Sequence, residues 1–224
     1  TWVAYKIVDR WKPAWKVWDE FDQGKRSPLS IDALPGTRAV RSQASTPAEI
    51  QAQFDPMSYQ KGGALLRMIE DYVGERDFRA GVRAYMKRYG YKNAESAQLW
   101  REIEKASGKP VRAMAEKWLE RPGVPVVDVL MTNSLSRSLM FEQKRFSAFG
   151  LKDASLWPVP MTIRYRLRGE RKSRTHRMLL SDDAGWGGNG TVSLPGKGEL
   201  LWAYPNAGEL GYYRLTFGRA ALRR

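Results

Sequence analysis

Residues 54–68 read FDPMSYQKGGALLRM, and this stretch carries the strongest signal in the chain. It places Tyr59 just ahead of the Gly62–Gly63 pair and of an apolar run with helical spacing. The first N–H groups of a helix have no partners within the helix, so its N-terminus is locally positive. We therefore expect the Tyr59 phenol to lie at a helix end, where its hydroxyl could donate a hydrogen bond to a developing oxyanion. A tyrosine that merely covers a helix end would fit the local pattern equally well.

The first part of the chain, residues 1–123, is predicted to be mostly helical. Residues 46–49, Thr-Pro-Ala-Glu, combine a capping threonine, a proline at the first helical position and a capping-box glutamate. A short helix is expected from Pro13, and residues 24–45, rich in Gly, Pro, Ser and Arg, are expected to be an irregular connection. Four amphipathic helices then follow, one of them capped by Ser96. Their expected terminators are Gly74, Gly90, Gly108 and Pro122–Gly123.

The pattern changes after Pro125, and residues 124–224 are predicted to form a β-sandwich. Residues 126–131 and 157–167 alternate with a period close to two, as strands with one buried face do. Further short runs of this kind are separated by clusters of Gly, Asn, Asp and Pro. The expected fold class is therefore α+β in two domains, a helical domain at 1–123 and a β-sandwich at 124–224.

Two segments of the chain, residues 54–68 and 206–214, resemble motifs of the aminopeptidase N family of zinc metallopeptidases. Residues 54–68 are similar to its Phe-Asp-x-x-x-Tyr-x-Lys-Gly-Ala-x-x-x-Arg-Met run, and residues 206–214, NAGELGYYR, are similar to the signature that ends its β-sandwich domain. The resemblance covers nearly the whole chain, in order. It implies that residues 1–123 are the C-terminal part of a thermolysin-like catalytic domain. It also implies that Tyr59 stabilises the tetrahedral intermediate of peptide hydrolysis in the intact enzyme.

The zinc site of that family has no counterpart in this sequence. The family uses His-Glu-x-x-His and a later glutamate, whereas this chain has one histidine, His176, and no cysteine. Residues 1–5 look like the continuation just after that glutamate. We therefore expect a fragment of a zinc aminopeptidase, cut just past its metal site, which holds no zinc and is inactive by itself. Zinc and the peptide substrate belong to the parent enzyme.

The net charge of +14 raises an alternative from another class, a basic binding module for nucleic acid or another polyanion. Arg164, Arg166 and Arg168 fall on the outward face of an alternating strand, where solvent explains their charges without a binding partner. No aromatic residues for base stacking are expected between them on that face. Nucleic acid is therefore an unlikely partner. The densest cluster comprises Arg164, Arg166, Arg168, Arg171, Lys172, Arg174 and Arg177.

Other candidate sites and partners follow from single features. The lone His176 is expected to be a surface or edge residue. The carboxylate pairs Asp19–Glu20, Glu70–Asp71 and Asp182–Asp183 do not suggest an acid–base pair. No run is long enough to span a membrane, and the sequence leaves the compartment and the substrate-binding residues undetermined. A missing zinc-binding half is an expected partner. The N-terminal helix, with Trp2, Val3 and Ile7, would then expose an apolar face and favour self-association.

Overall fold

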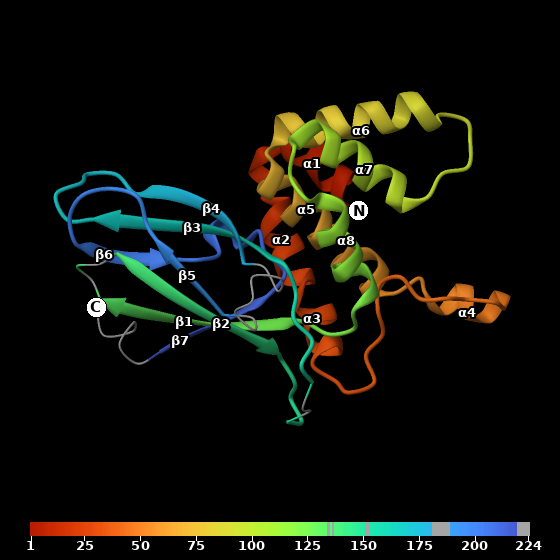
Figure 1. The fold of residues 1–224 in the computed structure, drawn as a ribbon. Coiled ribbons are helices and arrows are strands. Elements are labelled where there is room, and N and C mark those ends of the chain that lie inside the picture. Colours follow the sequence, from red (N-terminus) through yellow and green to blue (C-terminus); the bar gives the residue numbers. More distant parts are fainter. Residues whose placement is uncertain (134, 136, 151–152, 181–188, 219–224) are drawn as a thin grey trace.

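The computed structural model describes residues 1–224 except 134, 136, 151–152, 181–188 and 219–224. Helices come first along the chain and strands follow, so the predicted α+β fold class is confirmed (Figure 1). The helical elements are α1 (Trp2–Trp11), η1 (Pro13–Trp15), α2 (Val17–Gly24), α3 (Arg26–Asp32), α4 (Pro47–Ala52), η2 (Met57–Lys61), α5 (Gly62–Val73), α6 (Glu75–Tyr89), α7 (Ser96–Ser107), α8 (Val111–Glu120) and η3 (Ala207–Glu209).

The strands form two sheets that lie beside the helices in Figure 1. One sheet has the order β5-β2-β1-β7 and the other β4-β3-β6; the β1–β7 pair is parallel, and the other described pairs are antiparallel. In β2, Leu139, Phe141 and Gln143 are buried and their neighbours are exposed, as the period-two pattern predicts. The strands are β1 (Pro125–Asn133), β2 (Ser138–Arg145), β3 (Val159–Leu167), β4 (Arg174–Leu180), β5 (Asn189–Ser193), β6 (Leu200–Tyr204) and β7 (Arg214–Phe217).

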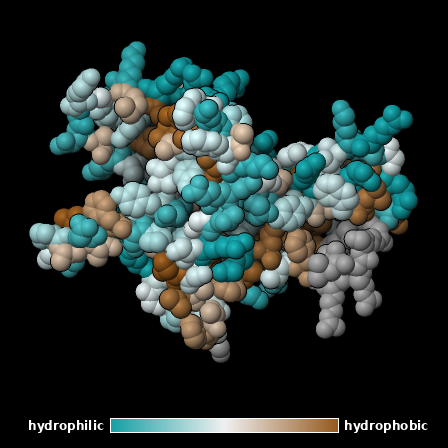
Figure 2. Space-filling model, turned by 180° about the vertical axis from the view of Figure 1, so that it is seen from behind, coloured by the Kyte–Doolittle hydropathy of each residue, from teal (hydrophilic) through white to brown (hydrophobic). Residues whose placement is uncertain are grey.

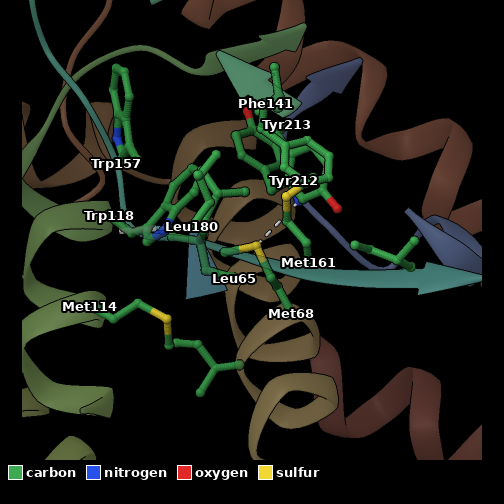
Figure 3. Packing of buried hydrophobic residues seen from close by; sticks show 14 of the residues in the cluster. Leu65, Met68, Met114, Trp118, Phe141, Trp157, Met161, Leu180, Tyr212 and Tyr213 are labelled. Atoms are coloured by element: carbon green, nitrogen blue, oxygen red, sulfur yellow. Dashed lines mark hydrogen bonds between the residues drawn. The ribbon is translucent and has the colours of Figure 1, made fainter. Parts of the chain in front are cut away.

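Helix α5 joins the helices to the sheets through one continuous apolar core. Its buried stripe includes Leu65 and Met68, which lie near residues of the strand half in Figure 3. The Met68 sulfur accepts a hydrogen bond from the backbone N–H of Tyr212 at 3.5 Å, drawn as the dashed line in Figure 3. The first half of β3 is buried on both faces because α5 covers the face that would otherwise meet water. In α8, the Trp118 indole N–H donates to the carbonyl of Pro158 at 2.8 Å and makes a second link of this kind.

Several predicted helix boundaries are correct. The Thr46 hydroxyl accepts from the Glu49 amide while the Glu49 carboxylate accepts from the Thr46 amide, which completes the predicted capping box of α4. Gly74 and Gly108 end α5 and α7 with positive φ angles of 94° and 66°. Only glycine adopts these angles without steric strain, which is why the two positions terminate helices.

Other boundaries were predicted wrongly. Residues 24–45 are not wholly irregular, because α3 lies within them; Pro28 falls in its first turn, where proline is tolerated. The segment after Pro13 is split into η1 and α2 at Lys16, whose φ is 49°. The N-cap of α7 is Glu95 rather than Ser96, since Glu95 and Gln98 form a capping box.

We predict that Gly81→Ala destabilises the protein. A Cβ at this position in α6 would lie 2.5 Å from the Cα of Ile103 in α7, so the two helices would have to separate. We expect a loss of about 1–3 kcal/mol in the free energy of unfolding, as for other overpacked cores. Gly62→Ala is the matched control because its Cβ meets nothing within 4 Å in a helical position, and it should leave stability unchanged or raise it. Urea denaturation of both variants tests this, and equal stabilities would contradict it.

Candidate functional site

Tyr59 lies inside a helical turn rather than ahead of one, which corrects the expected placement. The turn η2 has π-helical geometry and runs directly into α5. The amides of Ser58 and Tyr59 donate to the carbonyl of Asp55 at 3.2 and 3.1 Å, and the Asp55 carboxylate also accepts from the Ser58 amide at 3.0 Å. The backbone N–H groups of Ser58 and Tyr59 are therefore already hydrogen-bonded, whereas the sequence predicted unpaired N–H groups at this helix end. Single π-helical turns are rare and occur often at functional sites.

The Tyr59 side chain is 45% exposed and borders a groove of about 430 Å³. Its hydroxyl makes no hydrogen bond with another described residue, and its ring lies 6.2 Å from the ring of Phe54. The ring thus lies outside the core and beside the groove, where a bound molecule could reach its hydroxyl. The groove has a mainly apolar lining, to which Thr1 and Trp2 at the start of the chain contribute. Its other lining residues are Val40, Arg41, Ser58, Gly62, Gly63, Leu65, Leu66, Ile69, Ser96, Leu99, Trp100, Ala115, Trp118 and Leu119.

An ion pair holds the chain just before Tyr59. The Arg38 guanidinium donates to both carboxylate oxygens of Asp55, at 2.6 and 3.3 Å, and to the Ser58 hydroxyl at 3.1 Å. Burial by itself would raise the pKa of Asp55, but the hydrogen bonds from Arg38 and the Ser58 amide lower it below its usual value. Asp55 therefore stays ionised at neutral pH and keeps its bonds to the turn.

A second ion pair, fully buried, holds the chain just after Tyr59. The Lys61 ammonium lies 2.8 Å from the Asp32 carboxylate, both side chains are 0% exposed, and Lys61 also donates to the Gly123 carbonyl at 3.1 Å. Burial lowers the pKa of Lys61, and the charge of Asp32 opposes that effect. Asp32 further accepts from the Tyr212 hydroxyl at 2.8 Å, the Gly123 amide at 3.2 Å and the Thr37 hydroxyl at 3.0 Å. Burial, followed by the charge of Asp32, raises the pKa of Tyr212, which remains a neutral donor.

This cluster brings together the two segments that carry the family resemblance. Lys61 belongs to residues 54–68 and Tyr212 to residues 206–214, and they meet at Asp32. The sequence did not reveal Asp32 and Arg38 as partners, because both lie within residues 24–45, the segment expected to be an irregular connection. The one available signal was a lysine in an otherwise buried helical face, which requires a carboxylate partner.

The described residues contain no group of three or more His, Cys, Asp and Glu that could hold a metal ion. His176 lies in β4, paired with Ile163, and is partly exposed. The Glu70 carboxylate accepts from the Trp2 indole and Lys6, and Asp71 accepts from the hydroxyl of Thr162. Asp19 and Glu20 are exposed in the first turn of α2. Asp182 and Asp183 lie outside the described residues.

The arginine cluster is partly neutralised, and one expectation about it was wrong. Arg168, Arg174 and Arg177 form ion pairs with Glu199, Glu170 and Asp71. Aromatic residues do lie beside the other arginines, since Trp202 and Tyr204 of β6 pair directly with Arg166 and Arg164 of β3. On the face shown in Figure 2, hydrophilic residues cover most of the surface and hydrophobic residues form separate patches.

Helix α1 exposes an apolar face, although Trp2 is not part of it. Trp2 points inward, where its ring lies 5.2 Å from that of Phe78. Val3 and Ile7 are exposed as predicted, and Trp11 continues the same face at helical spacing. Trp15 of η1 is also exposed, and its ring lies 5.7 Å from that of Trp11. No helix among the described residues is long and apolar enough to cross a membrane.

Comparison with known proteins identifies relatives over most of the chain. The model of the peptidase family M1 domain matches residues 1–118. Aminopeptidase M1-A of Oryza sativa is 31% identical over 97% of this chain, and the tricorn protease-interacting factor F2 of Thermoplasma volcanium is 39% identical over 73%. The leucyl aminopeptidase of Saccharolobus solfataricus is 34% identical over 73% of this chain. The matched regions cover 24%, 21% and 20% of these three relatives, so the chain spans about a quarter of their length or less.

The family model covers more than half of the chain, and both signature segments lie at the groove or at the cluster that supports it. The chain therefore belongs to peptidase family M1, the aminopeptidase N family of metallopeptidases, which depend in general on zinc.

Proposed function

We propose that this chain is the part of an M1 aminopeptidase that supplies the oxyanion donor, Tyr59, for the removal of N-terminal residues from peptides. The observation that carries this proposal is the position of the phenol. It is half-exposed at an open groove, its hydroxyl is not engaged by a described residue, and its turn is held by ion pairs on both sides. Thr1 borders the same groove. In the family, the resemblance places a metal-binding glutamate immediately ahead of the residue that corresponds to Thr1.

The chemistry requires a donor that is already oriented. When water adds to a peptide carbonyl, negative charge develops on the carbonyl oxygen, and a fixed O–H donor stabilises that charge more than it stabilises the ground state. A tyrosine hydroxyl serves this purpose without changing its own protonation state. A peptide seated in this mainly apolar groove would displace water from Tyr59, and the lower local dielectric would strengthen such a hydrogen bond.

The residues of this chain do not form the zinc site that the family uses. Its sequence contains a single histidine and no His-Glu-x-x-His, and the described residues offer no cluster that fits a metal. We propose that the zinc ligands and the general base come from another part of the parent enzyme. The 224-residue chain alone is then inactive, and the metal-binding half is its partner.

The alternative, a basic module that binds nucleic acid or another polyanion, has weaker support. The strand pairing of Arg164 with Tyr204 and of Arg166 with Trp202 places two cations beside two aromatic residues. Three of the seven cluster cations, however, are already paired with carboxylates. A polyanion would have to displace these carboxylates, so we favour peptide over nucleic acid as the substrate class.

We further propose that the isolated chain self-associates through α1. The face formed by Val3, Ile7 and Trp11 continues to Trp15, and all four side chains are more than half exposed. Exposed apolar surface of this kind favours association with a second copy when the natural cover is absent.

We predict that Tyr59→Phe in the parent enzyme lowers kcat for an aminoacyl p-nitroanilide by about 10²–10³-fold with little change in KM, because one oxyanion donor is lost. Tyr91→Phe is the control, since Tyr91 is fully exposed in the turn between α6 and α7. The 224-residue chain should show no turnover. An unchanged kcat in Tyr59→Phe, or chelator-sensitive turnover by the chain alone, would refute the proposal.

We predict that Ile7→Asp abolishes self-association of the 224-residue chain, measured as the concentration dependence of mass in sedimentation velocity. Met86→Asp is the matched control because Met86 of α6 has the same exposed fraction, 61%, on a different helix. A wild-type chain that remains monomeric at every concentration would contradict the prediction, as would equal effects of the two substitutions.

A further inference from the structure

The turn that carries Tyr59 is tied at both ends to one short segment of the chain. Asp55 and Lys61, which flank Tyr59, pair with Arg38 and Asp32 respectively. We call these four residues the turn clamp. None of them lines the groove, and Arg38, Asp55 and Lys61 are instead bound to the turn or to its neighbouring segments.

The segment on the other side of the clamp is itself fixed to the body of the protein. The Arg41 amide donates to the carbonyl of Leu119 in α8 at 2.8 Å, and the carbonyl of Ala33 accepts from the Ala148 amide at 3.1 Å. These two bonds bracket Arg38 in the sequence. Arg38 is therefore presented by a held segment and not by a free loop.

Arg38 is oriented before it reaches the turn. Its Nη1 atom donates to the carbonyls of Ala39 and Val40 at 2.9 and 3.4 Å, and to the hydroxyl of Ser42 at 3.3 Å. The remaining donors, Nε and Nη2, then point at Asp55 and Ser58. A guanidinium fork used in this way fixes direction as well as distance, which the single ammonium of a lysine cannot do.

The two ion pairs differ in what they do. Lys61 and Asp32 are completely buried and join the turn to the strand half through Tyr212, so they serve the fold as a whole. Arg38 and Asp55 are partly exposed, and their side-chain hydrogen bonds to described residues lie within residues 38–42 and 55–58. Their removal should loosen the turn while the core stays intact.

We propose that Arg38, acting through Asp55 and Ser58, is a positioning residue that holds the π-helical turn so that the Tyr59 hydroxyl stays aligned with the reacting carbonyl. This inference rests on the proposed function of Tyr59. A donor that drifts by about 1 Å loses much of its effect on the rate, so the pair would influence catalysis without touching substrate.

The first test uses amide hydrogen exchange in the 224-residue chain. Arg38→Met should accelerate exchange at the Ser58 and Tyr59 amides about tenfold, because the turn opens more often, while the Ile103 amide in α7 is unchanged. Arg174→Met is the matched control, since Arg174 makes the same two-pronged contact with Glu170, at 2.9 and 2.5 Å, away from the turn. Wild-type exchange at Ser58 and Tyr59 in Arg38→Met would overturn the proposal.

The second test uses the parent enzyme and separates positioning from general stability. Arg38→Met should lower kcat about 10–100-fold with KM within twofold of wild type, and Arg38→Lys should fall in between. In the Tyr59→Phe background, Arg38→Met should have no further effect on kcat, because the group that it positions is gone.

The outcomes distinguish the inference from the function on which it rests. If Tyr59→Phe lowers kcat but Arg38→Met does not, or if Arg38→Met lowers kcat equally in both backgrounds, the positioning role is wrong and the oxyanion role stands. If Tyr59→Phe leaves kcat unchanged, both are wrong.

Discussion

The buried ion pair between Lys61 and Asp32 is the interaction on which the rest of this structure depends. Removing two charges completely from water is unfavourable unless each is compensated by its partner and by further hydrogen bonds. Here the compensation comes from Gly123 and Tyr212, which lie far away in the sequence. The hydrogen-bonding needs of the pair are therefore met only when Lys61, Gly123 and Tyr212 are assembled around Asp32. That requirement fixes the turn at Tyr59, two residues before Lys61, relative to the whole protein.

The site inherits its geometry from this joint. Helix α5 packs against β3, and the sulfur of its Met68 accepts a hydrogen bond from the Tyr212 amide. Leu65 and Ile69 of the same helix line the groove and belong to the continuous core. Tyr59 lies in η2, which runs directly into α5, and the ion pair between Arg38 and Asp55 holds the start of this turn. Membership of the M1 family supplies the chemical context for an exposed phenol at this place. The fold supplies the reason that the phenol has a defined position in a chain whose described residues form no metal site.

Much of the fold could be predicted from local sequence. Three features depend only on residues that are close in the sequence: the buried face of α5, the capping box at Thr46, and the alternation of buried and exposed residues in β2. Each can therefore be predicted from a short stretch of sequence. Helix α3 was missed because its composition resembles that of a loop, and its buried residues include Asp32, whose partner Lys61 is distant in the sequence. The π-helical turn was missed for a related reason. The residues on either side of Tyr59 pair with Arg38 and Asp32, and no periodicity in residues 54–68 predicts these partners. The role that we propose for Tyr59 rests on the resemblance to the family motif, because the local pattern alone does not distinguish it from a tyrosine that covers a helix end.

The most direct measurement of the central claim is the free energy of unfolding of Lys61→Met, from guanidinium denaturation followed by tryptophan fluorescence. Leaving Asp32 charged, buried and without its cation should destabilise the chain by about 3–5 kcal/mol. Lys25→Met is the comparison, because Lys25 is also nearly buried and pairs with Asp22, but at a more exposed edge. The account predicts a clearly larger loss for Lys61→Met than for Lys25→Met. A loss below about 1 kcal/mol, the value of an ordinary surface pair, would show that the joint does not depend on this ion pair.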